Sequence, residues 1–198
     1  MDDFDISKAL EALSNGEVIV YPTDTLYGLG ADIFNLNAVK NVYRIKKRPM
    51  NQPLSVSVSN IDQLCKIAYK NKLFDVISEK FLPGKLTVIL NKRDTVPDIV
   101  TAGKNKIAIR IPNNNIALRL LSEFGPITST SANIHGKKTP DIISDILMQF
   151  KADISVYIDI GKLFDLPSTI VDLTDNNIKI VRLGSISKKE IMDAIENG

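Results

Sequence analysis

Apolar residues follow two different spacings along the chain, and segments of the two kinds alternate. Short apolar runs and strict alternation predict strands at residues 17–21, 53–59, 85–92, 106–112, 126–133, 154–160, 168–173 and 177–184. Apolar residues three or four positions apart predict helices at residues 5–16, 35–49, 60–71, 72–84, 114–125, 139–150 and 187–195. Such interleaving predicts a single α/β domain over residues 1–198, with helices packed on a twisted sheet. The last two strands form a hairpin across residues 174–177, which predicts a mixed sheet instead of a parallel one.

Several helix ends carry recognisable signals. Pro49 is expected to end the helix at 35–49, because proline clashes with helical geometry in the residue before it. Thr139 and Pro140 suit the N-cap and the first position of the helix at 139–150. Ser187 and Glu190 have the spacing of a capping box and predict the start of the final helix.

Composition places the chain among ordinary soluble proteins. Its 198 residues are 44% hydrophobic and 24% charged. Cys65 is the only cysteine, which excludes an internal disulfide and a zinc–cysteine cluster. No apolar run approaches the roughly 20 residues of a membrane span, and the acidic N-terminus is unlike a signal peptide. We therefore expect a cytoplasmic protein with no membrane contact.

Three predicted strands become polar where an apolar continuation would be normal. The strand at 17–21 runs into "PTDTLYGLG", the strand at 106–112 carries Arg110, and the strand at 126–133 ends in "STSAN". Ligands of α/β proteins gather at strand ends, so the three segments together predict one shared site. The alternative is that their hydroxyl and amide groups only make turns and caps. Gly28 and Gly30 are expected to let the backbone turn tightly beside the site.

Positive side chains accompany these polar ends. Lys46 and Arg48 flank the end of the helix at 35–49, where cations also stabilise the helix dipole without any ligand. Together with Lys106, Arg110 and Arg182 they suit a polyanion, because arginine binds phosphate oxygens in pairs and lysine acts as a point charge. Both common phosphate-loop motifs are missing from the sequence. The net charge of only +2 argues against strong nucleic-acid binding by the protein as a whole.

The usual nucleophilic machinery is missing as well. His135 is the only histidine, and its segment "NIHGKKTP" predicts an exposed turn. The carboxylates Asp24, Asp32, Asp159 and Asp172 are scattered and suggest neither a general-acid pair nor a metal cluster. We therefore expect chemistry that needs no protein nucleophile.

These segments resemble the YrdC-type threonylcarbamoyl-AMP synthases. The resemblance spans nearly the whole chain and includes a K-x-R triplet at residues 46–48 and an S-x-N triplet at residues 131–133. It also covers the segments "VIVYPTDTLYGLGAD", "KKRP", "IAIRIP", "STSAN", "PSTIVDL" and "VRLG". Longer members carry a second domain, so the chain is similar to the single-domain form.

The resemblance implies a fold and a reaction. The fold is a twisted α/β sheet with a concave basic face. The reaction joins L-threonine, bicarbonate and ATP, with magnesium, into threonylcarbamoyl-adenylate and pyrophosphate. A partner transferase then passes the threonylcarbamoyl group to an adenosine of tRNA. Binding of tRNA or double-stranded RNA by the protein itself is a further expectation.

The resemblance also implies the residues of the site. Threonine-binding positions are Thr25, Ser57, Arg110, Ser129 and Ser168. ATP-binding positions are Lys46, Arg48, Gln52, Lys106, Ser131, Asn133, Thr139 and Arg182, of which Lys46 and Arg48 are also implied as catalytic. Relatives often have histidine where this chain has Ser57, and a one-residue gap makes Thr130 an alternative to Ser129. The metal ligands are left open.

Two alternative hypotheses concern proteins that share this fold. One is a binding module without chemistry, similar to the YciO-type proteins, which depart from the family at the S-x-N triplet. The other is the carbamoyl-transfer domain of hydrogenase maturation, which normally lies in a larger chain with zinc-finger cysteines. Intact Ser131 and Asn133 and the single cysteine favour the synthase.

Overall fold

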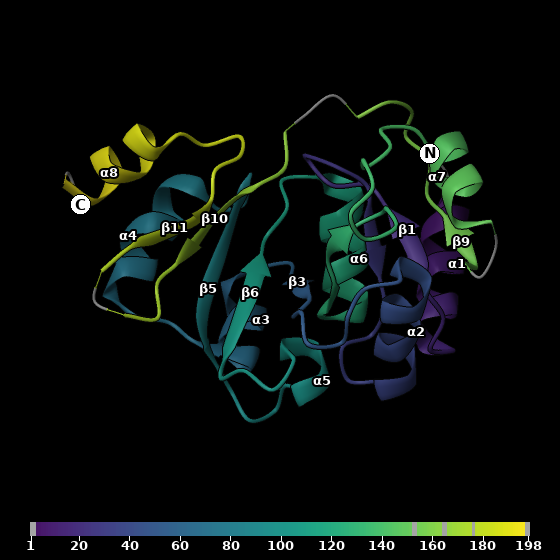
Figure 1. The fold of residues 1–198 in the computed structure, drawn as a ribbon, viewed down its shortest axis with the longest axis horizontal. Helices are drawn as coiled ribbons and strands as arrows, with labels where there is room; N and C mark the ends of the chain where they lie inside the picture. Colours follow the sequence, from purple (N-terminus) through teal and green to yellow (C-terminus); the bar gives the residue numbers. More distant parts are fainter. Residues whose placement is uncertain (1–2, 152–153, 164–165, 176, 197–198) are drawn as a thin grey trace.

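The computed structural model describes residues 3–151, 154–163, 166–175 and 177–196 (Figure 1). Its helices are α1 (Asp3–Ser14), α2 (Leu36–Lys46), α3 (Ile61–Ile67), α4 (Lys72–Phe81), α5 (Asp98–Thr101), α6 (Asn115–Phe124), α7 (Ile143–Phe150) and α8 (Lys188–Glu196). Its strands are β1 (Ile19–Tyr21), β2 (Gly28–Gly30), β3 (Ser55–Ser57), β4 (Ala68–Tyr69), β5 (Leu86–Lys92), β6 (Lys106–Arg110), β7 (Ile127–Thr128), β8 (Thr130–Ser131), β9 (Val156–Tyr157), β10 (Thr169–Asp172) and β11 (Lys179–Arg182). The predicted α/β class and the mixed strand directions are confirmed.

The strands form two mixed sheets, although the sequence predicted one. The larger has the order β11-β10-β5-β6-β3-β7, and the smaller has the order β8-β2-β1-β9. The amide of Thr128 donates to the carbonyl of Ala31 at 2.9 Å, and Asp32 forms an isolated bridge with Ile127. The segment from Ile127 to Ser131 thus changes from one sheet to the other and holds the two together.

Helices surround the sheets in two groups (Figure 1). In this view α4 and α8 lie at the left, beside β10 and β11, while α1, α2, α6 and α7 lie at the right, around β1 and β9. The marked chain ends are at opposite sides of the molecule. Strands β5, β6 and β3 lie between the two groups, so loops from both halves can meet near the middle.

Strand β1 is buried on both of its faces. Ile19 and Tyr21 pack into a cluster with α1 and α6, whereas Val18 and Val20 belong to the main core that includes α2. Successive side chains of a strand point to opposite sides, so one short apolar run serves both clusters. This explains the uninterrupted apolar letters of the predicted strand.

The two glycines after this strand have a different role from the predicted one. Gly28 and Gly30 do not form a tight turn but lie in β2, which pairs antiparallel with β1. A Cβ atom on Gly30 would come within 3.0–3.1 Å of side-chain carbons of Ile127, Ile19 and Tyr21. The strand therefore needs glycine for close packing, and the turn itself is made by the preceding threonine-rich segment.

Helix ends agree with the sequence in one case and differ in another. The predicted capping box is confirmed, because Ser187 Oγ accepts from the amide of Glu190 at 3.3 Å and Glu190 accepts from the amide of Ser187 at 2.8 Å. The predicted start of a helix at Thr139 and Pro140 is wrong, since α7 begins only at Ile143. The hairpin turn at 174–177 includes residue 176, which lies outside the described residues.

Within the described ranges, every helix is too short or too polar to cross a lipid bilayer.

Replacing Gly30 by alanine should destabilise the protein by about 1–3 kcal/mol, because three packed side chains must move to admit one methyl group. Gly28→Ala is the matched control, since the three atoms nearest to its Cβ all belong to the side chain of Tyr21, at 3.2 Å or more. Urea unfolding of both variants and the parent measures the difference. An equal loss in the two variants would contradict the packing argument.

Candidate active site

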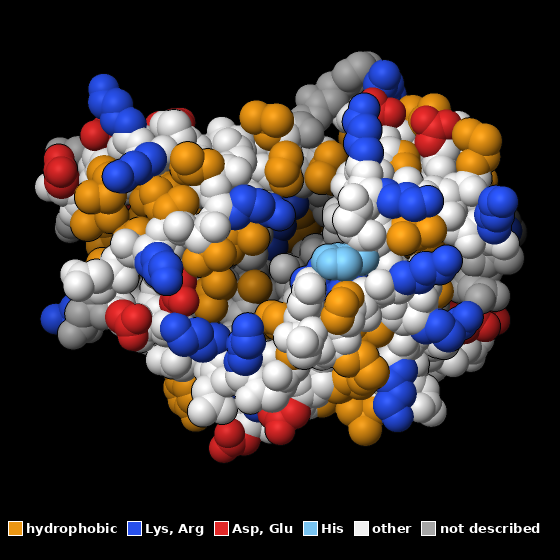
Figure 2. All heavy atoms as spheres, viewed as in Figure 1, with side chains coloured by type: hydrophobic (Ala, Val, Ile, Leu, Met, Phe, Trp, Pro, Cys, Tyr) orange, Lys and Arg blue, Asp and Glu red, His pale blue; other side chains and the backbone are white. Residues whose placement is uncertain are grey.

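A hollow of about 360 Å³ is lined by residues of both sheets and opens on the face shown in Figure 2. Its size suits a small ligand. The lining includes these residues predicted from the sequence: Thr25, Arg48, Arg110, Ser129, Ser131, Ser168 and Arg182. Segments far apart in the chain therefore converge, as the polar strand ends predicted.

The hollow is electropositive. Arg48, Arg110 and Arg182 line it, and no acidic side chain does so among the described residues. Burial lowers the pKa of Arg182, and the nearby charge of Arg110 lowers it further. Figure 2 shows Lys and Arg side chains gathered around the central depression. A ligand that brings several negative charges would relieve this repulsion.

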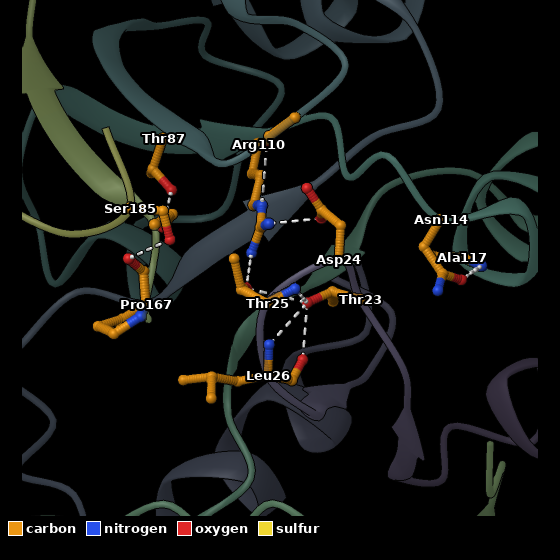
Figure 3. A network of polar contacts seen from close by, with 12 residues as sticks. Thr23, Asp24, Thr25, Leu26, Thr87, Arg110, Asn114, Ala117, Pro167 and Ser185 are labelled. Atoms are coloured by element: carbon orange, nitrogen blue, oxygen red, sulfur yellow. Dashed lines mark hydrogen bonds and ion pairs between the residues drawn. The ribbon is translucent and has the colours of Figure 1, made fainter. Parts of the chain in front are cut away.

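Arg110 is held on several sides (Figure 3). It extends from the end of β6, and its side chain is 7% exposed. One terminal nitrogen, Nη2, donates to Asp24 Oδ1 at 2.5 Å, and the other, Nη1, donates to Thr25 Oγ1 at 2.6 Å. Its Nε points to the carbonyl of Gly84 at 3.4 Å. These contacts give the guanidinium a defined plane in the wall of the hollow.

Two threonine hydroxyls continue this network. Thr23 Oγ1 donates to the carbonyl of Leu26 at 2.6 Å and lies 3.1 Å from Thr25 Oγ1. A hydroxyl has one proton, so Thr25 must be the donor between the two threonines. Thr25 then accepts from Arg110 and faces the hollow as an acceptor.

Lys46 joins the two signature triplets. Its buried ammonium donates to the carbonyl oxygens of Ser131 and Asn133, the latter at 2.8 Å, and to Asn133 Oδ1 at 3.2 Å. Ser131 Oγ in turn donates to Asn133 Oδ1 at 2.5 Å. Lys46 does not line the hollow, although the sequence predicted a phosphate contact. In this structure its direct role is to hold the S-x-N segment in place.

Arg48 lines the hollow from a turn that it helps to build. Its Nε donates to the carbonyl of Gln52 at 3.2 Å, and its Nη2 donates to the carbonyl of Pro53 at 2.9 Å. Lys47, between the two cations, has a left-handed backbone with a φ of 51° and ends α2. This change of direction turns Lys46 into the protein while Arg48 reaches the hollow. Gln52 contributes its backbone carbonyl to this turn.

The opposite wall is organised by Ser168. Its carbonyl accepts from Arg182 Nη2 at 2.7 Å, and its hydroxyl lies 2.8 Å from Thr87 Oγ1. Thr87 is buried, lines the hollow and was missed from the sequence. The available signal was a lone hydroxyl inside the apolar run of residues 85–92, comparable to Arg110 in its own strand.

Several predicted residues do not line the hollow. Ser57 neighbours Arg110 in the β3–β6 register but is fully buried, and its hydroxyl has no hydrogen-bond partner in the described part of the chain. Lys106 is paired with Asp172 at 3.1 Å. Thr139 lies at a separate small depression beside Asp141. The predicted roles of Ser57, Lys106 and Thr139 therefore remain predictions, as do those of the buried Lys46 and Asn133 and of Gln52.

Among the described residues, neither His135 nor any carboxylate lines the hollow. His135 is exposed and lies in a turn, as predicted. Across the described ranges, His, Cys, Asp and Glu side chains form no group of three or more that could hold a metal ion. Asp24 was set aside as one of several scattered carboxylates, yet it contacts Arg110 directly. Its position between two threonines of the polar segment was the signal that could have identified it.

The chain is similar in sequence to known proteins over most of its length. The family model Sua5_yciO_yrdC, described as "Telomere recombination", matches residues 11–184. A "Putative threonylcarbamoyl-AMP synthase" of Methanocaldococcus jannaschii is 44% identical over 184 residues, which cover 90% of this chain and 87% of the relative. The chain belongs to the Sua5/YciO/YrdC family.

Solved structures of Sua5 and YciO proteins share the fold. Pyrococcus abyssi Sua5 complexed with L-threonine superposes with a TM-score of 0.93 at 34% identity, covering 98% of this chain and 58% of that one. Escherichia coli YciO superposes with a TM-score of 0.86 at 31% identity, covering 94% of this chain and 92% of that one. The predicted Sua5/YciO/YrdC fold is thus confirmed, and the chain spans little more than half of the P. abyssi protein.

The buried amine of Lys46 should make the free energy of unfolding depend on pH. Burial, and then the charge of Arg48, lower the pKa of Lys46 to about 7, whereas an unfolded lysine titrates near pH 10.4. Between these values the unfolded chain binds more protons, so the parent should gain stability relative to Lys46→Met as pH rises, by at most about 1.4 kcal/mol per pH unit.

Urea unfolding at several pH values from 6.5 to 10 tests this expectation. Lys47→Met is the control, because it removes a neighbouring lysine that is exposed. A flat difference between the parent and Lys46→Met would show that the three oxygen acceptors keep the ammonium charged throughout.

Proposed function

We propose that this protein is a threonylcarbamoyl-AMP synthase, a nucleotidyltransferase that acts on L-threonine, bicarbonate and ATP. The observation that carries the proposal is the hollow lined by three arginines, several hydroxyls and no described acidic side chain. Relatives named as threonylcarbamoyl-AMP synthases support it, as does the P. abyssi Sua5 complex with L-threonine. The products are threonylcarbamoyl-adenylate and pyrophosphate.

The proposed reaction brings together groups that repel each other. The amine of threonine combines with bicarbonate, with loss of water, and forms an N-carboxy compound. Its new carboxylate attacks the α-phosphorus of ATP and expels pyrophosphate. Two carboxylates and a triphosphate must therefore meet in one small volume. Fixed positive charge in a partly dry cavity is the effective remedy, because it needs no rearrangement as the reaction proceeds.

The arginines divide this work by their positions. Arg110, which contacts Asp24 and Thr25, would hold the carboxylate of threonine. Arg48 and Arg182 line other walls and would bind the phosphates. Correct placement of the reactants can supply roughly 7–11 kcal/mol of the barrier. No protein nucleophile is required.

Magnesium belongs to this proposal as the ion that accompanies ATP. Mg²⁺ is usually bound by one or two carboxylates together with substrate phosphates. The described lining offers hydroxyl and carbonyl oxygens but no carboxylate, so it fits an ion carried mainly by the phosphates. When bound, the ion would neutralise part of the triphosphate charge.

The product is a reactive mixed anhydride and needs an acceptor. We propose that a partner transferase uses it to modify an adenosine of tRNA, that tRNA or double-stranded RNA contacts this protein, and that both steps occur in the cytoplasm. The competing proposal is a YciO-like nucleotide- or RNA-binding protein without activity, which the fold equally allows. The intact S-x-N triplet, held by Lys46, favours the synthase.

A reconstituted reaction tests the proposal. Purified protein is incubated with MgATP, bicarbonate and L-threonine, and the release of pyrophosphate and of the adenylate is measured by chromatography. We expect both products only when all three substrates are present. Pyrophosphate release that ignores threonine, or no release at all, would reject the synthase and leave the binding protein.

Replacing Arg110 should weaken the use of threonine more than that of ATP. The loss of a charge-assisted contact of about 2–3 kcal/mol corresponds to a fall of roughly 30- to 150-fold in kcat/KM for threonine. Arg110→Lys keeps the charge beside Asp24, and Arg119→Ala removes an exposed arginine as a control. Equal losses for threonine and ATP in the Arg110 variants would count against the assigned role.

Replacing Arg48 should act on ATP instead. We expect Arg48→Ala to raise the KM for ATP about tenfold, equivalent to about 1.4 kcal/mol, because a phosphate partner is lost. Arg44→Ala serves as the control, because Arg44 is exposed on α2, one turn before Arg48, and its Nε donates to Asn41 Oδ1 at 3.3 Å. An unchanged KM for ATP in Arg48→Ala would remove this residue from the site.

A further inference from the structure

Asp24 is a buried carboxylate of which only one oxygen has a hydrogen-bond partner among the described residues. Its side chain is 9% exposed, and Oδ1 contacts Arg110 Nη2 at 2.5 Å (Figure 3). The other oxygen, Oδ2, is buried and has no hydrogen-bond partner among the described residues. A charged oxygen left in this state costs free energy, so the arrangement calls for an explanation beyond stability.

Asp24 is not among the residues that line the hollow, so it would not contact a ligand bound there. Thr23, Thr25 and Arg110 line the hollow, whereas Asp24 does not, although it lies between the two threonines in sequence. Asp24 therefore meets the guanidinium from behind the wall. Its charge compensates Arg110 without placing an anion where an anionic substrate has to enter.

Three contacts of Arg110 with described residues differ in length and in the charge of the acceptor. The Nε contact to Gly84 is long, at 3.4 Å, and Thr25 Oγ1 is a neutral acceptor at 2.6 Å. Asp24 supplies the one charged acceptor of the three, at 2.5 Å, so it alone adds ion-pair attraction to the hydrogen bond. Among these three partners, Asp24 is the one expected to dominate the orientation of the guanidinium.

We propose that Asp24 is a positioning residue that aims Arg110 at the carboxylate of the amino-acid substrate. This inference rests on the proposed function, because it assigns Arg110 to that carboxylate. Asp24 holds the guanidinium plane from behind the wall and so keeps its orientation before substrate arrives. The opposite possibility is that Asp24 competes with the substrate for Arg110, and the two differ in the sign of the effect.

Steady-state kinetics on the full chain distinguish these possibilities. We expect Asp24→Ala to raise the KM for threonine at least tenfold and to leave the KM for ATP within twofold. Asp24→Asn keeps the size and one acceptor oxygen, so its KM for threonine should rise less, about three- to tenfold. Where the alanine variant does not fold, the asparagine variant alone decides.

Asp32→Asn is the matched control. Asp32 follows β2, and its Oδ1 accepts a hydrogen bond from the amide of Phe34 instead of from Arg110. This variant should keep the parent's KM for both substrates. A KM for threonine that is unchanged or lower in Asp24→Asn would overturn the proposal. An equal rise for threonine and ATP would overturn it too, because a merely structural loss affects both substrates.

A second measurement needs no substrate and so separates this inference from the proposed function. In protein labelled with ¹⁵N-arginine, the Nε–H signal of Arg110, assigned with Arg110→Lys, should show faster solvent exchange in Asp24→Asn than in Asp32→Asn. Equal exchange would overturn the positioning role even in an active enzyme. Faster exchange in a protein without synthase activity would reject the proposed function and keep Asp24 as the residue that orients Arg110.

Discussion

The architecture depends on keeping positive charge in the wall of a small cavity. A guanidinium group in this wall, or an ammonium group buried beside it, needs oxygen partners, since burying an unpaired charge is costly. Here the partners come from distant segments: Asp24 lies 86 positions before Arg110, and Ser131 lies 85 positions after Lys46. The bonds that fix the cations therefore also tie together segments that would otherwise be independent.

Most of the oxygen partners of these cations are main-chain carbonyl groups. Lys46, Arg48 and Arg182 all donate to them, and Arg110 alone has a close carboxylate. Carbonyl groups orient a cation without neutralising it, so the hollow stays electropositive and attractive to anions. The carboxylate that contacts Arg110, that of Asp24, is not part of the lining, so its negative charge does not repel an incoming substrate.

Close packing serves the same end. The strand β2 can approach β1, Ile127 and Tyr21 because Gly30 has no side chain, and β2 carries the threonine-rich segment at its start. The segment from Ile127 to Ser131 leaves one sheet and enters the other, which brings the S-x-N residues next to Lys46. Small residues and sheet crossing thus place the polar groups within hydrogen-bonding distance of each other.

Residue patterns along the chain were enough to predict the α/β class, most helices and strands, the capping box at Ser187 and the convergence of polar strand ends. These features depend on spacing and neighbouring residues, which a sequence displays directly. It did not determine the second sheet, the packing role of Gly30 or the late start of α7.

Which cations face the hollow depends on the packing of the whole chain. Lys46 and Arg48 are two residues apart, yet the left-handed Lys47 sends one inward to Asn133 and the other to the cavity. Likewise, nothing in the spacing of Asp24 and Arg110 reveals their contact. Such pairings depend on how distant strands cross and on which buried charge must be compensated, and both are settled only when the whole chain has packed.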